Sequence, residues 1–199
     1  MFSRLNEIFS ENLPVVPLET QLAKLSSLGI VPRDGVAPGR ILEKFTREEL
    51  EETPYMMLLA ALGGVFENED GEWLPLSDDI VCLDTECIEE GGIYTEIVRR
   101  LCVLSKGALV LTDVSDVIDP DAGTARVSFT CDGVTGGFEL ELTDALIDTA
   151  LFVNFNLLLS QAGVKDEFFL HLEDRDMIVI YGGANRAKQL GRLTGTHFE

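Results

Sequence analysis

The stretch that decides the fold is ARVSFTCDGVTGGFELELTDALIDTALFVNFNLLLSQAGVKDEFFLHLEDRDMIVIY, residues 125–181. Within it, residues 125–131 and 138–143 alternate between apolar and polar side chains, which is the pattern of half-buried strands with one wet face. The segment between them, DGVTGG, is rich in residues that tolerate positive φ angles. It predicts an antiparallel hairpin with a loop of several residues.

The apolar period then becomes helical over residues 148–163. Asp148 is a suitable N-cap and Gly163 is well placed just past the C-terminus. One apolar face contains Leu151, Phe152, Phe155, Leu158, Leu159 and Ala162, and a second strip contains Ala150, Val153 and Leu157. Because a helix that is apolar on two sides is usually covered on both, we expect one side to lie on the sheet and the other to meet the N-terminal half.

Two further strands are predicted at 167–173 and 177–181. The second is apolar on both faces, which is typical of a central strand. Gly182-Gly183 ends it, and a short helix is expected over 184–191.

The rest of the chain supplies mostly helices. Helical spacing predicts helices at 18–28, 55–62 and 94–104, with a short one near the start of residues 1–17. Thr46 and Glu49 form a capping box at the start of another. Strands are expected at 80–83 and 108–112, followed by an acidic connector over 113–121.

These elements predict an α+β fold. We expect a mainly antiparallel sheet of about five or six strands, packed against the 148–163 helix and an N-terminal helical layer. The length of 199 residues fits one domain, 1–199, in which residues 1–107 are mostly helical and residues 108–199 supply the sheet and its helix.

Composition indicates a soluble protein with an ample core. The hydrophobic fraction is 46%, yet no apolar run approaches the roughly 20 residues that span a bilayer. The N-terminus, MFSRLNEIFSENL, lacks the apolar core of a signal peptide. We therefore expect a cytoplasmic location and no contact with the membrane; the oligomeric state is left open.

Cysteine usage gives no sign of a metal or cofactor. The chain has Cys82, Cys87, Cys102 and Cys131, and its two histidines, His171 and His197, lie far from the first pair in sequence. The Cys82–Cys87 spacing is not CxxC, so a zinc site is not expected. Three of the four cysteines lie inside apolar or alternating runs, a setting that suits reduced, buried thiols.

The charge is both large and uneven. The net charge is −20, which argues against binding to nucleic acid. Residues 48–98 contain fifteen Asp and Glu and no Lys or Arg. This acidic block is either a solvated face or a docking surface for a basic protein partner, with Glu67, Glu69, Asp70 and Glu72 as candidate contacts. Trp73, in the same acidic loop, is either an interface anchor or a lid over the core.

Catalytic motifs are not evident. The sequence contains no phosphate-binding loop, nucleophile elbow or zinc helix, and no Ser/His/Asp arrangement can be assembled from it. Asp84 and Glu86 follow a predicted strand, where paired carboxylates could bind a ligand or perform acid–base chemistry. Residues two apart at a helix start do not face each other, and the favoured alternative is that Asp84 is only a helix N-cap. The sequence leaves open whether the chain is an enzyme and favours a non-enzymatic role.

Three segments carry a resemblance to a known family: PYMMLLAALGG (54–64), IVCLDTECIEEGGIYTEIVRRL (80–101), and GALVLTDVSDVID (107–119) with its alternating hairpin. They resemble a family of uncharacterised bacterial proteins with a DTECIE-type segment. The typical member has Trp or Phe in the strand before DTECIE and Asp-Pro before the long helix. Here Val81-Cys82 and Asp148-Thr149 stand at those places, while RLTG is kept at 192–195.

The resemblance implies no catalytic residues. The small, acidic character is similar to that of immunity proteins in bacterial toxin systems. The expected function is therefore non-enzymatic protein binding of an immunity-like kind. The alternative is a small-molecule binder or enzyme that uses Asp84 and Glu86 at the end of strand 80–83.

Overall fold

The computed structural model describes residues 15–86, 91–143 and 146–199. The fold is α+β, as predicted. Its elements in chain order are α2 (Leu18–Ser27), the 3₁₀ helix η2 (Pro38–Glu43), α3 (Arg47–Glu52), α4 (Met56–Leu62), β1 (Val65–Glu67), β2 (Trp73–Pro75), β3 (Ile80–Asp84), α5 (Ile93–Leu104), β4 (Leu111–Asp119), β5 (Thr124–Cys131), β6 (Val134–Glu141), α6 (Ala150–Gln161), β7 (Glu167–Glu173), β8 (Asp176–Gly182) and α7 (Ala184–Thr194). The short helix expected near the start of 1–17 lies outside the described residues.

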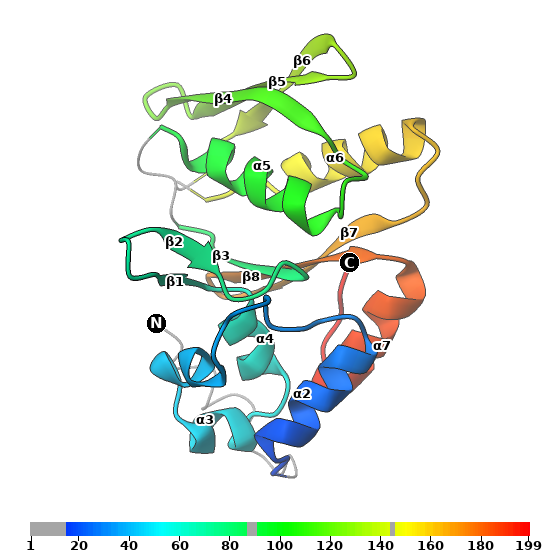
Figure 1. The fold of residues 1–199 in the computed structure, drawn as a ribbon. Coiled ribbons are helices and arrows are strands. Elements are labelled where there is room, and N and C mark those ends of the chain that lie inside the picture. Colours follow the sequence, from blue (N-terminus) through cyan, green and yellow to red (C-terminus); the bar gives the residue numbers. More distant parts are fainter. Residues whose placement is uncertain (1–14, 87–90, 144–145) are drawn as a thin grey trace.

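The described strands form three antiparallel sheets instead of one sheet of five or six strands. The strand orders are β1-β2, β3-β8-β7 and β4-β5-β6. Figure 1 shows the layers: the β4–β6 sheet, then α5 and α6, then the β3-β8-β7 sheet, and finally α2, α3, α4 and α7. Because α5 and α6 lie between the two larger sheets, strands on either side of them cannot share backbone hydrogen bonds.

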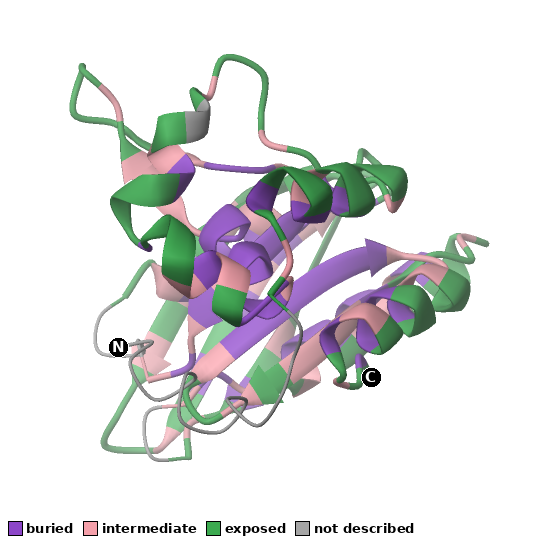
Figure 2. Cartoon of the chain, turned by 90° about the horizontal axis from the view of Figure 1, so that it is seen from below, coloured by how far each residue is buried: buried purple, intermediate pink, exposed green. Residues whose placement is uncertain are grey.

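The β3-β8-β7 sheet separates two hydrophobic cores. Met177, Val179 and Tyr181 of β8 face the core formed with α5, α6 and the β4–β6 sheet. Ile178 and Ile180 face the core formed with the N-terminal helices and α7. Buried residues accordingly occupy both faces of this sheet (Figure 2). The prediction that 177–181 is a central strand with two apolar faces is confirmed.

The β5–β6 hairpin is tighter than expected. Asp132 and Gly133 both have positive φ angles, 50° and 76°, and Cys131 pairs with Val134 directly across them. Two central residues with positive φ make the turn that matches the strand twist, and Asp-Gly is a favoured sequence for it. Residues 134–137, predicted to be loop, therefore belong to β6.

Strand β4 is displaced and longer than predicted. It covers Leu111–Asp119, so most of the expected acidic connector is strand. A register shift between Thr112 and Ser115 coincides with a positive φ of 52° at Asp113. The bulge explains why no clean alternation is visible in this stretch of the sequence.

Helix α6 is covered on one side only. Leu151, Phe152, Phe155 and Leu159 are buried, whereas Val153 is 67% and Leu157 55% exposed. The prediction that the second apolar strip meets the N-terminal half is wrong, since the N-terminal helices pack on the far face of the β3-β8-β7 sheet (Figure 1). The prediction that Asp148 is the N-cap of this helix is wrong by one residue: Thr149 is the N-cap, and the Asp148 carboxylate accepts a hydrogen bond from Ala150 N at 2.9 Å.

The outer edge of β7 is occupied by groups from elsewhere in the chain. The Asn156 side chain of α6 accepts from Phe168 N at 2.8 Å and donates to Phe168 O at 2.9 Å. Glu199 exchanges two backbone hydrogen bonds with Leu170, the next residue whose backbone faces outward. Satisfying these groups keeps the edge from pairing with another strand.

The N-terminal helices are joined by one buried amide. Gln21 is fully buried, donates to Val16 O and Leu50 O, and accepts from Tyr55 N. The capping box of Thr46 and Glu49 is present at the start of α3, as predicted.

No helix in residues 15–86, 91–143 or 146–199 has both the length and the apolar character needed to cross a membrane.

Candidate functional site

The acidic segment that holds Trp73 is a hairpin and not a loop. β1 and β2 pair from Val65↔Pro75 to Glu67↔Trp73. Asn68 shapes the turn, because its side-chain oxygen accepts from Asp70 N at 3.0 Å and from Glu72 N at 2.8 Å. Gly71, at φ 80°, completes it. These hydrogen bonds stabilise the turn, and the Asn68 amide also donates to the Glu72 carboxylate at 3.1 Å.

The five residues predicted to contact a partner come together on this hairpin. The side chains of Glu67, Glu69, Asp70 and Glu72 are exposed, and Trp73 is 65% exposed. The interpretation of Trp73 as a lid over the core is therefore wrong. Its ring lines a hollow of about 350 Å³. The other lining residues are Arg40, Glu43, Lys44, Val65, Phe66, Glu67 and Leu76.

Ion pairs neutralise part of the acidic block but none of the hairpin carboxylates. Elsewhere in the block, five acids pair with cations from outside it: Glu51–Arg47, Asp78–Arg33, Asp79–Lys106, Glu86–Arg175 and Glu96–Arg99. Four others, Glu48, Glu49, Glu52 and Asp84, form no ion pair with a described residue. The four hairpin carboxylates form no ion pair with any residue that the structure describes. The β1–β2 hairpin thus carries four carboxylates without an ion pair within six consecutive residues, Glu67 to Glu72.

Asp84 and Glu86 have structural partners. Asp84 ends β3, and its side chain accepts from Glu86 N at 3.0 Å. The Glu86 carboxylate lies 2.6 Å from the Arg175 guanidinium in the β7–β8 turn. Asp176 stands opposite Asp84 in the ladder, and burial, followed by the charge of Asp84, raises its pKa above the usual value. The chemical role for Asp84 and Glu86 remains a prediction.

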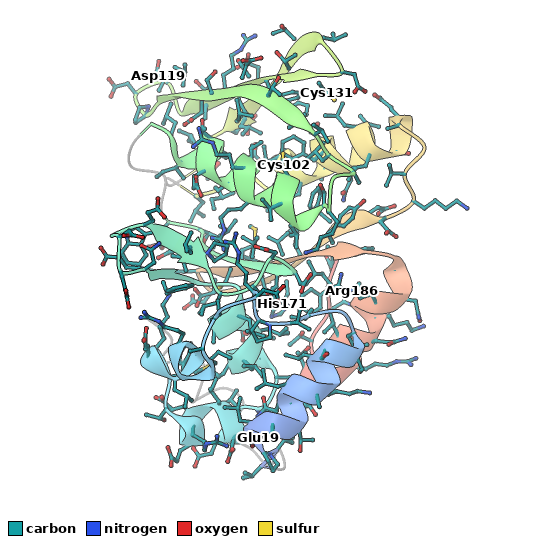
Figure 3. The ribbon with its side chains drawn as sticks, viewed as in Figure 1. Glu19, Cys102, Asp119, Cys131, His171 and Arg186 are labelled. Atoms are coloured by element: carbon teal, nitrogen blue, oxygen red, sulfur yellow. The ribbon has the colours of Figure 1, made fainter. Side chains whose placement is uncertain are left out.

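The described cysteines are free thiols, and Cys87 lies outside the described residues. Burial raises the pKa of Cys82 to about 12 and also raises the pKa of Cys102. Cys102 lies on α5 and Cys131 at the end of β5 (Figure 3). Among the residues that the structure describes, no group of three or more His, Cys, Asp or Glu side chains is arranged to hold a metal ion.

Sequence reasoning missed a second cavity, on the surface between α5, the β2–β3 connection and the loop after α2. Its lining includes Arg33, Arg99 and Arg100. The local signal in the sequence is that Arg99 and Arg100 are the first cations after the acidic block, a placement that also suits the C-terminal end of a helix. Arg33 joins them only through the tertiary fold.

Comparison of the chain with models of protein families, with curated proteins and with solved structures finds no match.

Proposed function

We propose that the chain is a non-enzymatic binding protein whose β1–β2 hairpin docks against a basic protein partner. One observation carries the proposal: four exposed carboxylates without a described cationic partner lie on one turn beside an exposed tryptophan. Exposed Trp side chains are enriched among the residues that dominate binding energy at interfaces. Uncompensated carboxylates on a rim increase the rate of encounter with a positively charged surface.

The hollow beside Trp73 gives the contact a shape as well as a charge. Phe66 and Trp73 form its aromatic walls, and Arg40 lies over the Phe66 ring at 5.2 Å from the ring centre. An apolar side chain of the partner would enter the hollow, while the cations around it would meet the hairpin carboxylates. In the complex, this apolar side chain would be shielded from water and surrounded by polar contacts, which is the arrangement found in effective interfaces.

The overall charge of −20 supports a partner of opposite sign. In its most concrete form the role is immunity-like: the partner is a basic toxin, and the hairpin covers a portion of its surface. Catalysis is not needed for such a role, because occupying the surface of the partner is sufficient to neutralise it.

The test is affinity capture from a lysate of the encoding organism at low and high salt, followed by mass spectrometry. The hairpin variant carries Glu67→Lys, Glu69→Lys, Asp70→Lys and Glu72→Lys, and a second variant carries Trp73→Ala. The matched control reverses four exposed acids elsewhere, Asp121, Glu139, Glu141 and Glu167. Glu139 pairs with Arg126, but both are exposed, so this pair contributes little to stability.

We expect a basic protein to be retained by the wild type and by the control at low salt, and to be released at high salt. Both hairpin variants should lose it, with affinity lowered about tenfold or more. Equal capture by the wild type and the four-residue hairpin variant would contradict the proposal. An empty wild-type capture at both salt concentrations would favour the solvated-face interpretation instead.

A further inference from the structure

The cavity between α5 and the β2–β3 connection is built from three segments that are distant in sequence. It has a volume of about 190 Å³. Arg33 comes from the loop after α2, Ile80 and Val81 from β3, and Arg99 and Arg100 from α5. This convergence is a feature of ligand pockets, which form where separate elements meet.

Three guanidinium groups line this cavity, although the chain has only fifteen Lys and Arg against thirty-five Asp and Glu. Arg33 Nε lies 3.6 Å from Asp78, and Arg99 Nη1 lies 3.7 Å from Glu96. Both distances are long for charge-assisted hydrogen bonds. Each of the four side chains is exposed over about one-third of its surface or more. These pairs leave hydrogen-bond donors free for a ligand.

Arg100 differs from the other two because its counter-charge is missing. Its guanidinium donates to Gly63 O at 2.5 Å and to Cys82 O at 3.4 Å, and no carboxylate of the described residues lies within 4.0 Å of it. Burial lowers its pKa, as expected for a cation removed from water without a paired anion. The two carbonyl oxygens orient the group but do not neutralise its charge.

The remaining wall of the cavity is apolar apart from Ser77, whose hydroxyl donates to Val31 O. Ile80 and Val81 are buried beneath it, Pro75 borders it, and Val103 is 52% exposed. The volume is close to that of an engineered cavity of about 150 Å³ that binds benzene in another protein. A body of about one ring therefore fits against this wall.

The net charge of the side chains that line the cavity favours a carboxylate over a phosphate. Three arginines less the two carboxylates of Asp78 and Glu96 leave one positive charge. A carboxylate, with one negative charge, balances it, whereas a phosphate monoester brings about −1.5 to −2 at neutral pH. Guanidinium groups also match the two oxygens of a carboxylate in shape.

We propose that this cavity binds a small organic monocarboxylate, with the carboxylate at Arg99 and Arg100 and an apolar body of about one ring against Val81 and Val103. The site is separate from the β1–β2 turn, so it does not depend on the protein-docking role. It also differs from a site at Asp84 and Glu86, which would attract cations.

The probe is 4-fluorobenzoate, titrated into the full chain and followed by ¹⁹F NMR of the probe and ¹H–¹⁵N NMR of the protein. We expect saturable binding with a dissociation constant on the order of 1 mM, as suits a ligand of so few atoms. Amide shifts should cluster at Val81 and along α5 near Val103. The cationic isostere 4-fluorobenzylamine should not bind there, and phenyl phosphate should bind more weakly than the carboxylate.

The variants avoid Arg100, whose hydrogen bonds to Gly63 and Cys82 also hold the fold. Arg99→Gln removes an exposed guanidinium and should weaken binding about tenfold, and Val103→Glu should abolish it by placing a carboxylate at the apolar wall. Arg192→Gln, an exposed cation of α7, is the control and should leave binding unchanged. Failure of the wild type to bind the probe, amide shifts confined to other surfaces, or equal affinity in Arg99→Gln would each overturn the proposal.

Discussion

Asp84 and Asp176 are paired residues in the ladder that joins β3 to β8, so two half-buried carboxylates face each other at the end of the sheet. Burial raises the pKa of Asp176 above its usual value, and the charge of Asp84 raises it further. Like charges directly opposite each other in a sheet are destabilising. This pair is therefore expected to weaken the fold at neutral pH.

Replacing Asp176 by Asn should remove that penalty. Because the folded-state pKa of Asp176 lies above its unfolded value, the folded state holds the proton more tightly. Wild-type stability from this group is therefore greatest at low pH and declines as the pH rises through the folded pKa. We expect Asp176→Asn to raise Tm by about 1–3 °C at pH 7, and by less near pH 4. Thermal unfolding followed by circular dichroism measures both differences.

Asp121→Asn is the control for that measurement, because Asp121 is exposed at the β4–β5 turn. Its Tm should follow that of the wild type at both pH values. A neutral-pH Tm for Asp176→Asn that is equal to or below the wild-type value would show that Asp84 does not destabilise its neighbour.

The same strand, β8, shows how much of the fold can be predicted. Its residues are apolar on both faces, and each face packs into one of the two cores. This pattern is visible in a short stretch of sequence, so it identifies a central strand. Strands β5 and β6 each have one wet face, which is the pattern of a sheet covered on one side. That difference is compatible with the two separate sheets of the structure. The sequence nevertheless predicts a single one, because pairing partners cannot be deduced from periodicity.

The missed contacts are long-range. The pairing of β3 with β8 joins Ile80 to Ile180, and no local pattern encodes that choice. Strands β1 and β2 have three residues each, too few for an alternation to be recognised, so their sequence predicts a loop. The acidic and aromatic residues of this hairpin nevertheless lie together in the structure, because they are adjacent in sequence. Arg33 and Arg100 are far apart in sequence, and only the folded chain brings them to one cavity.

The Arg186 side chain links three parts of the fold by hydrogen bonds to backbone carbonyl groups. Its guanidinium donates to Tyr181 O of β8 at 2.5 Å and to Gly29 O after α2 at 2.9 Å, while its own backbone belongs to α7 (Figure 3). Hydrogen bonds from charged donors contribute about 1.5–3 kcal/mol each. Removing the guanidinium leaves the carbonyl of the buried Tyr181 without this donor, whereas water can replace it at the exposed Gly29. We expect Arg186→Ala to lower the free energy of unfolding by about 2–4 kcal/mol in urea denaturation.

Arg186→Lys separates charge from geometry in the same experiment. Lysine keeps the positive charge but cannot span both carbonyls with a planar fork, so its loss should approach that of alanine. Arg192→Ala, on the same helix and exposed, should change the unfolding free energy by less than about 0.5 kcal/mol. Wild-type stability in Arg186→Ala would mean that neither hydrogen bond contributes.

Gly63 is required at the point where α4 meets β3. Its backbone φ of −73° is open to any residue, so the requirement is steric and not conformational. A Cβ at this position would lie 2.6 Å from Cys82 N and 2.8 Å from Cys82 Cβ, and Cys82 N also donates to Gly63 O at 2.9 Å. The added methyl group must therefore push β3 away from the helix.

Gly63→Ala should lower the free energy of unfolding by about 1–3 kcal/mol, the usual effect of overpacking a rigid contact. Gly39→Ala is the matched control, since a Cβ at Gly39 has no atom within 4 Å and its φ is not positive. Urea midpoints of the two variants give the comparison directly. Displacement of β3 should also loosen the hydrogen bond from Arg100 to Gly63 O, so Gly63→Ala should weaken 4-fluorobenzoate binding as well. A destabilised variant with unchanged binding would show that the two carbonyl oxygens do not position Arg100 for the ligand.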